Sequence, residues 1–292
     1  MKQLVIAGVT FLCFVASLQF AAAAVVIAPG AGRFDFYFQG KSGRPMNVWS
    51  YRPKDLPPAR PILFVMAGTR RDAQRYRDEW QSYAERFKAL LLAPEFSAEL
   101  FPGRRAYNLG NLAPNDGVNG LPKDSAFAII EKIFDYTRQV AGLTSASYRI
   151  YGHSAGAQFV HRLVLFNPQA RVDAAVAANA GWYTMTDFSM GFPYGLKDSL
   201  ISPDDLKLAF GKKLLIALGE NDNDPNDRVL NRSAGAMRQG TGRLERGRNF
   251  FRQAELTAAR LGAPFNWRLL TVSGVGHLNS AMAQAVAPLL LK

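Results

Sequence analysis

The chain has 292 residues, of which 48% are hydrophobic and 20% are charged; this composition is typical of a globular protein and excludes a disordered one. Lysine and arginine outnumber aspartate and glutamate by 35 to 23, which gives a formal net charge of +12. The arginines are scattered over every region and form no block with interleaved aromatic residues, so the charge does not indicate nucleic-acid binding. We interpret it as a solvated basic surface that favours contact with anionic envelope or polymer surfaces.

The first segment, residues 1–24, predicts a secretory signal peptide. It has one lysine, an apolar stretch of about fifteen residues and a run of alanines that offers an A-x-A cleavage site. A membrane anchor is the alternative, but the apolar stretch is shorter than the roughly 20 residues that a spanning helix needs. Cleavage would leave residues 25–292, which is 292 − 24 = 268 residues, as one domain that is secreted or periplasmic and not inserted in a membrane. Its net charge would be +11, since Lys2 is removed.

The only cysteine, Cys13, lies inside the segment to be removed. The mature chain would therefore contain no disulfide, no thiolate metal site and no cysteine nucleophile.

The predicted elements, taken in chain order, indicate a doubly wound α/β fold. Residues 33–39 and 45–53 alternate in polarity and flank the turn GKSG, which predicts an antiparallel hairpin. Further strands and helices then alternate, with strands at 61–68, 89–96, 147–152, 172–180, 213–219 and 265–272, and helices at 75–88, 123–140, 154–166, 250–262 and 278–290. This order predicts a mostly parallel sheet covered on both faces. Residues 181–211 form a predicted irregular insertion after the sixth strand and are a candidate small cap.

Residues 151–156 read YGHSAG, at the end of one predicted strand and the start of a predicted helix. This context is what a nucleophile elbow requires, and it places Ser154 beyond the carboxyl end of a strand, where ligands bind in open α/β sheets. Gly152 and Gly156 lack the side chains that would collide in so tight a turn, which leaves the serine strained and its hydroxyl exposed. The alternative is that Ser154 is an ordinary helix N-cap.

A serine hydroxyl needs a base to take its proton, and the chain has three histidines. His153 precedes the serine and points elsewhere in a tight turn. His161 lies two turns along the same helix, so it cannot reach the serine oxygen and we expect a structural role. His277 lies in the glycine-rich loop SGVGHLNS, where a turn can aim an imidazole across the top of the sheet. His277 is therefore the candidate base, with a capping or structural role as the alternative.

An acid that orients this imidazole should lie between the serine and the histidine in chain order, after a strand. The segment KLLIALGENDNDPND supplies Glu220, Asp222, Asp224 and Asp227, of which Asp227 is expected to be a turn residue. A calcium loop is another interpretation of D-N-D-P-N. An EF-hand, however, needs glycine and glutamate where Asp227 and Ser233 stand, so we predict no metal site.

Backbone N–H groups should stabilise the oxyanion of an acyl-transfer reaction. Ala155 supplies one, and the second is predicted to come from Thr69 in the loop MAGTRRD, where Gly68 allows a close approach. Arg70 and Arg71 either contact the substrate or are merely solvated. Aromatic residues of the insertion form either a substrate pocket or ordinary core, namely Trp182, Tyr183, Phe188, Phe192 and Tyr194.

These motifs resemble the α/β-hydrolase superfamily over about residues 33–292. The similar segments include GTRRDAQRYRDEW, APEF, GHSAGAQFVHR, NAGWYT with FPYG, LGENDNDP, RLERGRNF and GVGH, and they resemble secreted esterases grouped with poly(3-hydroxyalkanoate) depolymerase-like and feruloyl-esterase-like enzymes. The resemblance implies an α/β-hydrolase fold in which Ser154 is the nucleophile, His277 the base, and Thr69 and Ala155 the oxyanion donors. It favours Asp222 over Asp224 as the acid, three residues past Gly219. One departure is Ala67, where many relatives have histidine.

The sequence therefore predicts a serine hydrolase that cleaves carboxylic esters through a Ser154, His277 and Asp222 triad and an acyl-enzyme intermediate. Such an enzyme requires no cofactor and acts on a small-molecule or polymeric ester, with Trp182 and Tyr183 as candidate substrate-binding residues. One alternative is another serine acyl-transfer enzyme, such as a peptidase or an acyltransferase. A second is a non-catalytic binding protein that keeps the fold.

Overall fold

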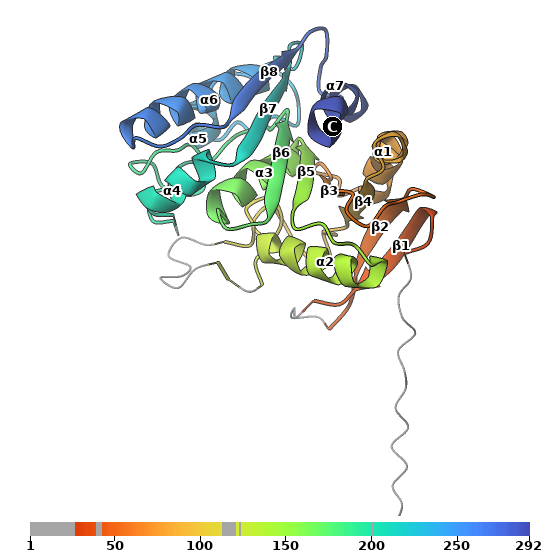
Figure 1. Ribbon diagram of the computed structural model, residues 1–292. Helices are drawn as coiled ribbons and strands as arrows, with labels where there is room; N and C mark the ends of the chain where they lie inside the picture. Colours follow the sequence, from red (N-terminus) through yellow and green to blue (C-terminus); the bar gives the residue numbers. More distant parts are fainter. Residues whose placement is uncertain (1–26, 39–42, 113–120, 123, 200) are drawn as a thin grey trace, which may run out of the picture.

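An eight-stranded sheet runs through the centre of the molecule, with helices on both of its faces (Figure 1). The structure is a computed structural model that describes residues 27–38, 43–112, 121–122, 124–199 and 201–292. The predicted signal peptide at 1–24 lies outside these residues. The strands are β1 (Gly30–Phe36), β2 (Met46–Arg52), β3 (Ile62–Met66), β4 (Leu90–Pro94), β5 (Tyr148–His153), β6 (Val172–Ala178), β7 (Lys213–Gly219) and β8 (Arg268–Val272).

The order of the strands across the sheet is β1-β2-β4-β3-β5-β6-β7-β8. The predicted hairpin is confirmed, because β1 and β2 pair antiparallel with Phe36 opposite Met46. β2 also pairs antiparallel with β4, and every pairing from β4 to β8 is parallel. The prediction of an α/β-hydrolase fold with a mostly parallel sheet and an N-terminal antiparallel hairpin is therefore confirmed.

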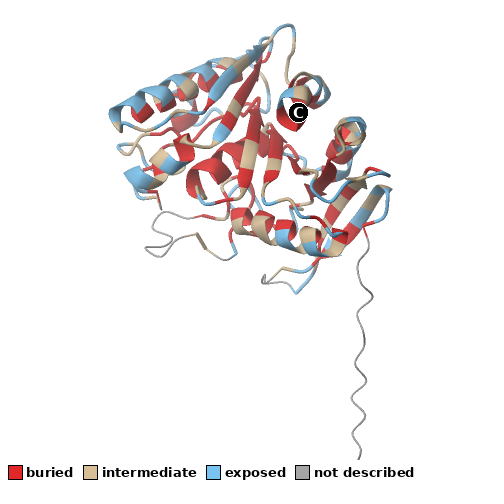
Figure 2. Ribbon diagram, in the orientation of Figure 1, coloured by how far each residue is buried: buried red, intermediate tan, exposed pale blue. Residues whose placement is uncertain are grey.

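Seven helices cover the described part of the sheet: α1 (Ala73–Phe87), α2 (Ala126–Ala141), α3 (Ala155–Phe166), α4 (Pro203–Phe210), α5 (Ala234–Met237), α6 (Arg243–Arg260) and α7 (Asn279–Leu291). α1 and α7 contact one another and pack on one face. α2, α3, α4 and α6 contribute to the core on the other face. Figure 2 shows the buried residues in red, gathered on the sheet and on the sides of the helices that face it.

The central strands are buried on both faces, which explains why they appear in the sequence as continuous apolar runs. In β3, Ile62, Phe64 and Met66 pack with the helices of one face, and Leu63 and Val65 pack with α1 and α7 on the other. β8, at the sheet edge, is mostly exposed or half-buried.

The structure differs from the predicted elements between residues 181 and 260. α4 falls inside the predicted irregular insertion, where Ser202 and Asp205 form a capping box with Pro203 at the first turn. α6 begins at Arg243, seven residues before the predicted start at 250. The prediction starts too late because the first turns of the helix bury Arg243 and Arg246, which are not apolar. An apolar periodicity cannot detect such turns.

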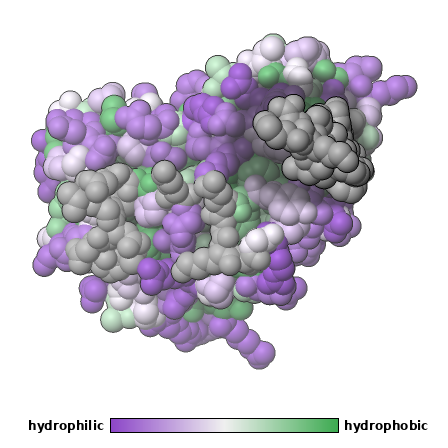
Figure 3. Space-filling view, turned by 90° about the horizontal axis from the view of Figure 1, so that it is seen from below, coloured by the Kyte–Doolittle hydropathy of each residue, from purple (hydrophilic) through white to green (hydrophobic). Residues whose placement is uncertain are grey.

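The interpretation of the basic charge as a solvated surface is wrong for four arginines that are buried: Arg77, Arg162, Arg243 and Arg246. They remain inside because carbonyl oxygens and carboxylates accept their hydrogen bonds. On the face seen in Figure 3, hydrophilic side chains predominate around the grey atoms. Among the residues that the structure describes, no helix is both long and apolar enough to cross a bilayer.

Candidate active site

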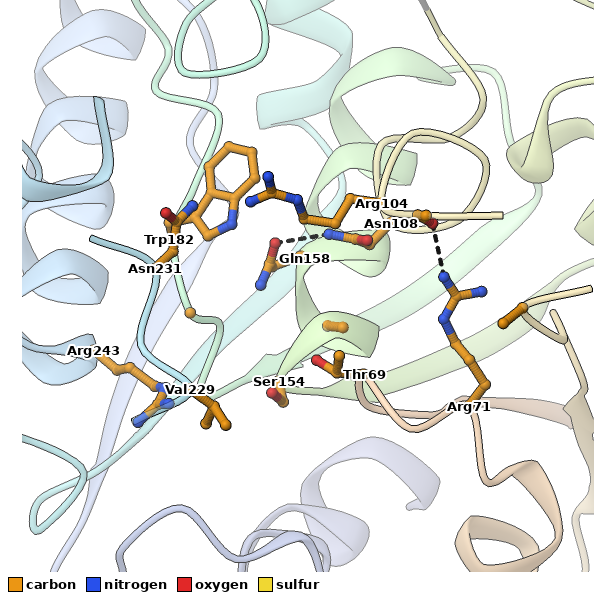
Figure 4. A pocket seen from close by; sticks show the side chains of 14 residues that line it. Thr69, Arg71, Arg104, Asn108, Ser154, Gln158, Trp182, Val229, Asn231 and Arg243 are labelled. Atoms are coloured by element: carbon orange, nitrogen blue, oxygen red, sulfur yellow. Dashed lines mark hydrogen bonds between the residues drawn. The ribbon is translucent and has the colours of Figure 1, made fainter. Parts of the chain in front are cut away.

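Ser154 lies in a tight turn between β5 and α3, with a φ of 58° and a ψ of −115°. A Cβ atom added to Gly152 would lie 2.2 Å from the Gly156 carbonyl oxygen, and one added to Gly156 would lie 2.0 Å from the Met66 carbonyl oxygen. The steric reason predicted for these two glycines is thus confirmed. The Ser154 side chain makes no capping hydrogen bond, and it faces a cavity (Figure 4).

The loop after β3 runs beside this turn. A Cβ atom added to Gly68 would lie 3.7 Å from the Ser154 Cβ and 2.8 Å from the Tyr76 hydroxyl, so only glycine fits there without displacing a neighbour. Ala67, where many relatives have histidine, accepts a hydrogen bond from the Tyr107 hydroxyl at 2.6 Å through its carbonyl oxygen. This bond fixes the backbone that leads to Thr69.

Thr69 and Ala155 line the same cavity as Ser154. No described residue accepts a hydrogen bond from the Thr69 N–H. Ala155 is the first residue of α3, and the N–H groups of a first helical turn have no partner within their helix. Two backbone donors are therefore available near the serine hydroxyl, as an oxyanion hole requires.

His277 and Asp222 are joined by a 2.6 Å hydrogen bond between the histidine Nδ1 and one carboxylate oxygen. Asp222 lies in the turn after β7 and is only 4% exposed. Its other carboxylate oxygen accepts a hydrogen bond from Arg243 at 2.9 Å, and Arg243 also reaches Asp227 at 2.7 Å. Asp222 is therefore held from two sides, by an imidazole and by a buried guanidinium.

Two backbone contacts keep the His277 loop at the carboxyl ends of the strands. The Asn221 N–H donates to the Val275 carbonyl at 2.8 Å. The Asn179 side chain, at the end of β6, donates to the Gly276 carbonyl at 3.0 Å and accepts from the Gly219 N–H at 2.7 Å. Asn179 has a φ of 52°, a conformation that asparagine tolerates better than most residues.

The imidazole of His277 packs against the elbow itself. Its ring centroid lies 4.6 Å from that of His153, the residue before Ser154. The structure thus brings Ser154 and His277 to the same edge of the sheet, although they are far apart in sequence. His153 is fully buried, and burial, followed by the nearby His277, lowers its pKa well below the ordinary histidine value. A neutral His153 places no positive charge against the His277 ring.

The remaining acidic candidates lie elsewhere. Asp224 is exposed and accepts a hydrogen bond from the Asn226 N–H at 2.8 Å. Asp227 accepts from the Val229 N–H at 2.8 Å, as expected for a turn residue, in addition to its contact with Arg243. Glu220 accepts from the Ser273 hydroxyl at 2.6 Å. Of the four, only Asp222 contacts His277 in the described structure.

His161 is buried two turns along α3 from Ser154 and does not line the cavity. Its Nε2 accepts from the Thr184 N–H at 3.1 Å, so Nδ1 carries the proton and donates to the Ala157 carbonyl at 3.0 Å. Burial, followed by the adjacent Arg162, lowers its pKa well below the ordinary value. Both ring nitrogens are therefore engaged: Nδ1 bonds within α3, and Nε2 holds α3 to the segment after β6, which is a structural arrangement.

The cavity beside Ser154 has a volume of about 430 Å³ and is more polar than the sequence suggested. Of the five aromatic residues named as pocket candidates, only Trp182 lines it. Tyr183 is in the core, where its ring stacks on Phe250 with 4.5 Å between centroids. Tyr194 packs behind Trp182 at 4.8 Å. Residues 181–211 therefore contribute two wall residues, Gly181 and Trp182, and much of the core.

Arginines take the place of the expected aromatic lining. Arg71, Arg104 and Arg243 all line the cavity (Figure 4). Arg71 is half-buried over the Tyr107 ring at 4.1 Å and donates to the Gly103 carbonyl at 2.8 Å. Sequence reasoning named Arg71 but missed Arg104, Asn108, Gln158 and Arg243. Only Gln158 carried a signal, because it lies one helical turn after Ser154.

Among the side chains that the structure describes, no group of three or more His, Cys, Asp or Glu residues is placed to hold a metal ion. The acidic residues in and next to the segment D-N-D-P-N make the contact with His277, the contact with Arg243 and two turn hydrogen bonds.

No protein-family model matches the chain, and no curated protein matches it. Two solved structures are similar throughout. Poly(aspartic acid) hydrolase-1 from Sphingomonas sp. KT-1 is 42% identical, with a TM-score of 0.84 over 90% of this chain and 99% of that one. LpqC, a poly(3-hydroxybutyrate) depolymerase from Bordetella parapertussis, is 33% identical, with a TM-score of 0.82 over 90% of each chain.

A more distant structure has the same fold. The S-formylglutathione hydrolase FrmB from Staphylococcus aureus is 18% identical, with a TM-score of 0.55 over 89% of this chain and 97% of that one.

Proposed function

The chain belongs to the serine hydrolase family of depolymerases and esterases with the α/β-hydrolase fold, and on that premise we propose that it is a secreted hydrolase of carboxylic esters. The observation that carries the proposal is the hydrogen bond of 2.6 Å between Asp222 and His277, whose ring lies against the residue before Ser154. The substrates are small-molecule or polymeric esters, since both similar hydrolases are named for polymers.

The proposed reaction uses the nitrogen of His277 that Asp222 leaves free. Because Nδ1 is engaged with Asp222, Nε2 accepts the proton of the Ser154 hydroxyl as its oxygen attacks the ester carbonyl. The negative oxygen that forms is stabilised by the N–H groups of Thr69 and Ala155. Collapse returns the proton to the alcohol, which leaves. Water then attacks the acyl-enzyme in the same way and releases the acid.

Secretion is part of the proposal and rests on the sequence pattern of residues 1–24. We expect the mature protein to begin at residue 25 and to be recovered from the periplasm or the medium. N-terminal sequencing of the protein from those fractions tests this expectation, and an intact N-terminus on protein from the cytoplasm would contradict it.

A second candidate function is hydrolysis of amide bonds in a polymer. The observation that favours it is the 42% identity with poly(aspartic acid) hydrolase-1. The same serine chemistry cleaves amides if the departing nitrogen is protonated by the histidine. Parallel assays on matched ester and amide oligomers decide which bond is cleaved faster.

The ester activity is tested with the purified protein and p-nitrophenyl butyrate. Ser154→Ala should abolish turnover without lowering Tm, because the side chain makes no capping bond. Asp222→Asn should reduce kcat far more than its matched control Asp224→Asn, since Asp224 is exposed and does not contact His277. Full activity in Ser154→Ala would remove the proposed nucleophile, and a larger loss in Asp224→Asn would remove the proposed acid.

A further inference from the structure

We propose that the cavity contains a carboxylate-binding subsite next to Ser154, made by Arg104 and Gln158 above the buried Arg162. The substrate is then an ester whose acyl group carries a second, free carboxylate. This inference rests on the proposed function and names its substrate class.

The first observation is the charge of the cavity wall. Its lining residues include arginines and amides but no aspartate or glutamate. Arg243 is neutralised by Asp222 and Asp227, whereas the side chain of Arg104 contacts no carboxylate in the part of the chain that the structure describes. Figure 4 shows Arg104 extending between Trp182 and Asn108, over the side chain of Gln158. A positive group is thus aimed into the cavity without a counter-charge.

The second observation is a buried arginine behind this wall. Arg162 has no exposed surface, and its acceptors are neutral: the Thr184 hydroxyl at 2.8 Å, the Asn108 carbonyl at 2.9 Å and the Gln158 carbonyl at 3.2 Å. Its guanidinium lies 4.2 Å from the centroid of the Trp182 ring, and its Nη2 atom has no hydrogen-bond partner among the residues that the structure describes. A buried charge without a counter-ion is costly, so a retained one points to an anion that is supplied from outside.

The two guanidinium groups act on the same region. The pKa of Arg162 is lowered to about 9, mainly by burial, and the positive charge of Arg104 contributes to this decrease. Like charges that lie close together with no acid between them repel each other. A carboxylate bound in the cavity near both would relieve this repulsion, and its attraction to Arg162 would be strengthened by the low dielectric of the interior.

The third observation is the orientation of Gln158. This side chain is only 7% exposed, and its oxygen accepts a hydrogen bond from the Asn108 side chain at 2.8 Å. This hydrogen bond places the amide nitrogen of Gln158 on the side of the group that points away from Asn108. No described residue accepts a hydrogen bond from that nitrogen. Asn231, another lining residue, also has a buried side-chain nitrogen without a partner in the described part of the chain. Unused donors of this kind fit an anionic oxygen better than an apolar group.

The position along α3 indicates where the carboxylate lies in the substrate. Gln158 follows Ser154 by four residues, and its N–H donates to the Ser154 carbonyl. Four residues of helix rise by about 6 Å, which is the span of a short dicarboxylic acid. One carboxyl group of such an acid would be the ester at Ser154, and the other would lie against Gln158 and Arg104.

The test compares two esters of the same shape. Monoethyl glutarate carries the free carboxylate, and the ethyl ester of glutaric acid monoamide replaces it with a neutral amide. With the wild-type protein we expect kcat/KM to favour the carboxylate ester by about tenfold to a hundredfold, as for a hydrogen-bonded charge. Arg104→Gln and, separately, Gln158→Leu should each bring this ratio towards one.

The matched control is Arg105→Gln, which removes the same charge from the next residue, exposed and outside the cavity lining. It should keep the wild-type ratio. Free glutarate should also inhibit hydrolysis of p-nitrophenyl butyrate competitively, and more strongly than glutaric monoamide does. Far-ultraviolet circular dichroism and Tm establish that each variant is folded.

The outcomes separate the subsite from the proposed function. Equal kcat/KM for the two esters, or a preference that Arg105→Gln reduces as much as Arg104→Gln, would overturn the subsite while leaving the hydrolase. The subsite would also be overturned if the protein hydrolyses p-nitrophenyl butyrate but cleaves neither glutarate ester and is not inhibited by glutarate. Absence of any Ser154-dependent hydrolysis would instead overturn the proposed function on which the subsite rests.

Discussion

Removal of the Arg243 side chain, as in Arg243→Met, tests whether the candidate acid is held in place from both sides. Arg243 and Asp222 each have 3% of the side chain exposed, and they are joined at 2.9 Å. Methionine fills similar space but leaves one oxygen of Asp222 buried without its charged partner. Breaking a buried ion pair in this way costs about 3–5 kcal/mol. Because His277 still donates to the other oxygen, we expect the lower end of that range.

The stability loss and the catalytic loss are measured separately. For a chain of this size, about 3 kcal/mol corresponds to a decrease in Tm of roughly 6–12 °C. The carboxylate also loses its second anchor, so the imidazole of His277 is less well oriented, and kcat on p-nitrophenyl butyrate should fall about tenfold to a hundredfold. Differential scanning calorimetry gives the first quantity, and steady-state kinetics below the new Tm gives the second.

Arg248→Met is the matched control, because Arg248 is exposed on the same helix. It removes one positive charge without touching Asp222, so both quantities should stay near wild type. If Arg243→Met retains wild-type Tm and kcat, or if Arg248→Met lowers kcat equally, then the buried contact does not position Asp222. Arg243→Lys should be intermediate, since an ammonium group cannot reach both Asp222 and Asp227 in the geometry of a guanidinium.

Two further predictions follow from the loop after β3 and from the buried histidines. Gly68→Ala should lower kcat about a hundredfold, because its Cβ would lie 2.8 Å from the Tyr76 hydroxyl and displace the oxyanion loop; Gly191→Ala, with open space around it, should not. Burial lowers the pKa values of His153 and His161, so the unfolded chain binds protons below pH ~6.5 that the folded protein does not. The free energy of unfolding should therefore decrease as the pH falls below that value, by up to about 1.4 kcal/mol per pH unit for each histidine. In His161→Gln, Tm should decrease less steeply on acidification. A pH-independent Tm between pH 7.5 and 5 would contradict this.

The fold was predictable because its central strands carry two independent signals. Each is a short, continuous apolar run, and each is separated from the next by a segment with a helical period. The same reasoning failed at α6, whose first turns bury Arg243 and Arg246. A buried arginine looks like a surface residue in a hydropathy pattern, so the start of the helix was placed too late. α4 differs in that its signal is local: the helix is short and is marked in the sequence by the capping box at Ser202 and not by a long apolar period.

The residues of the candidate site that depend on local geometry were also predictable. The elbow needs a small residue on either side of Ser154, because a Cβ atom added to Gly152 or Gly156 would lie 2.2 Å or less from a backbone oxygen. The role of Tyr183 was not predictable in this way. Trp182 and Tyr183 are neighbours in an irregular segment without strand or helix periodicity, so the sequence cannot state which of the two side chains faces the cavity. The structure directs Trp182 to the cavity and Tyr183 to the core.

The charge of the cavity illustrates what a sequence pattern cannot contain. The arginines that line it, Arg71, Arg104 and Arg243, come from the loop after β3, the segment before α2 and the start of α6, and Arg162 lies buried on α3 behind them. In an open α/β sheet, loops from separate strands meet at the carboxyl edge, so a cationic site is assembled from arginines that are far apart in sequence. Scattered arginines therefore argue against a linear basic segment for nucleic acid, but they do not argue against a cationic pocket. In this fold, dispersal of the arginines along the chain is the expected pattern for such a pocket.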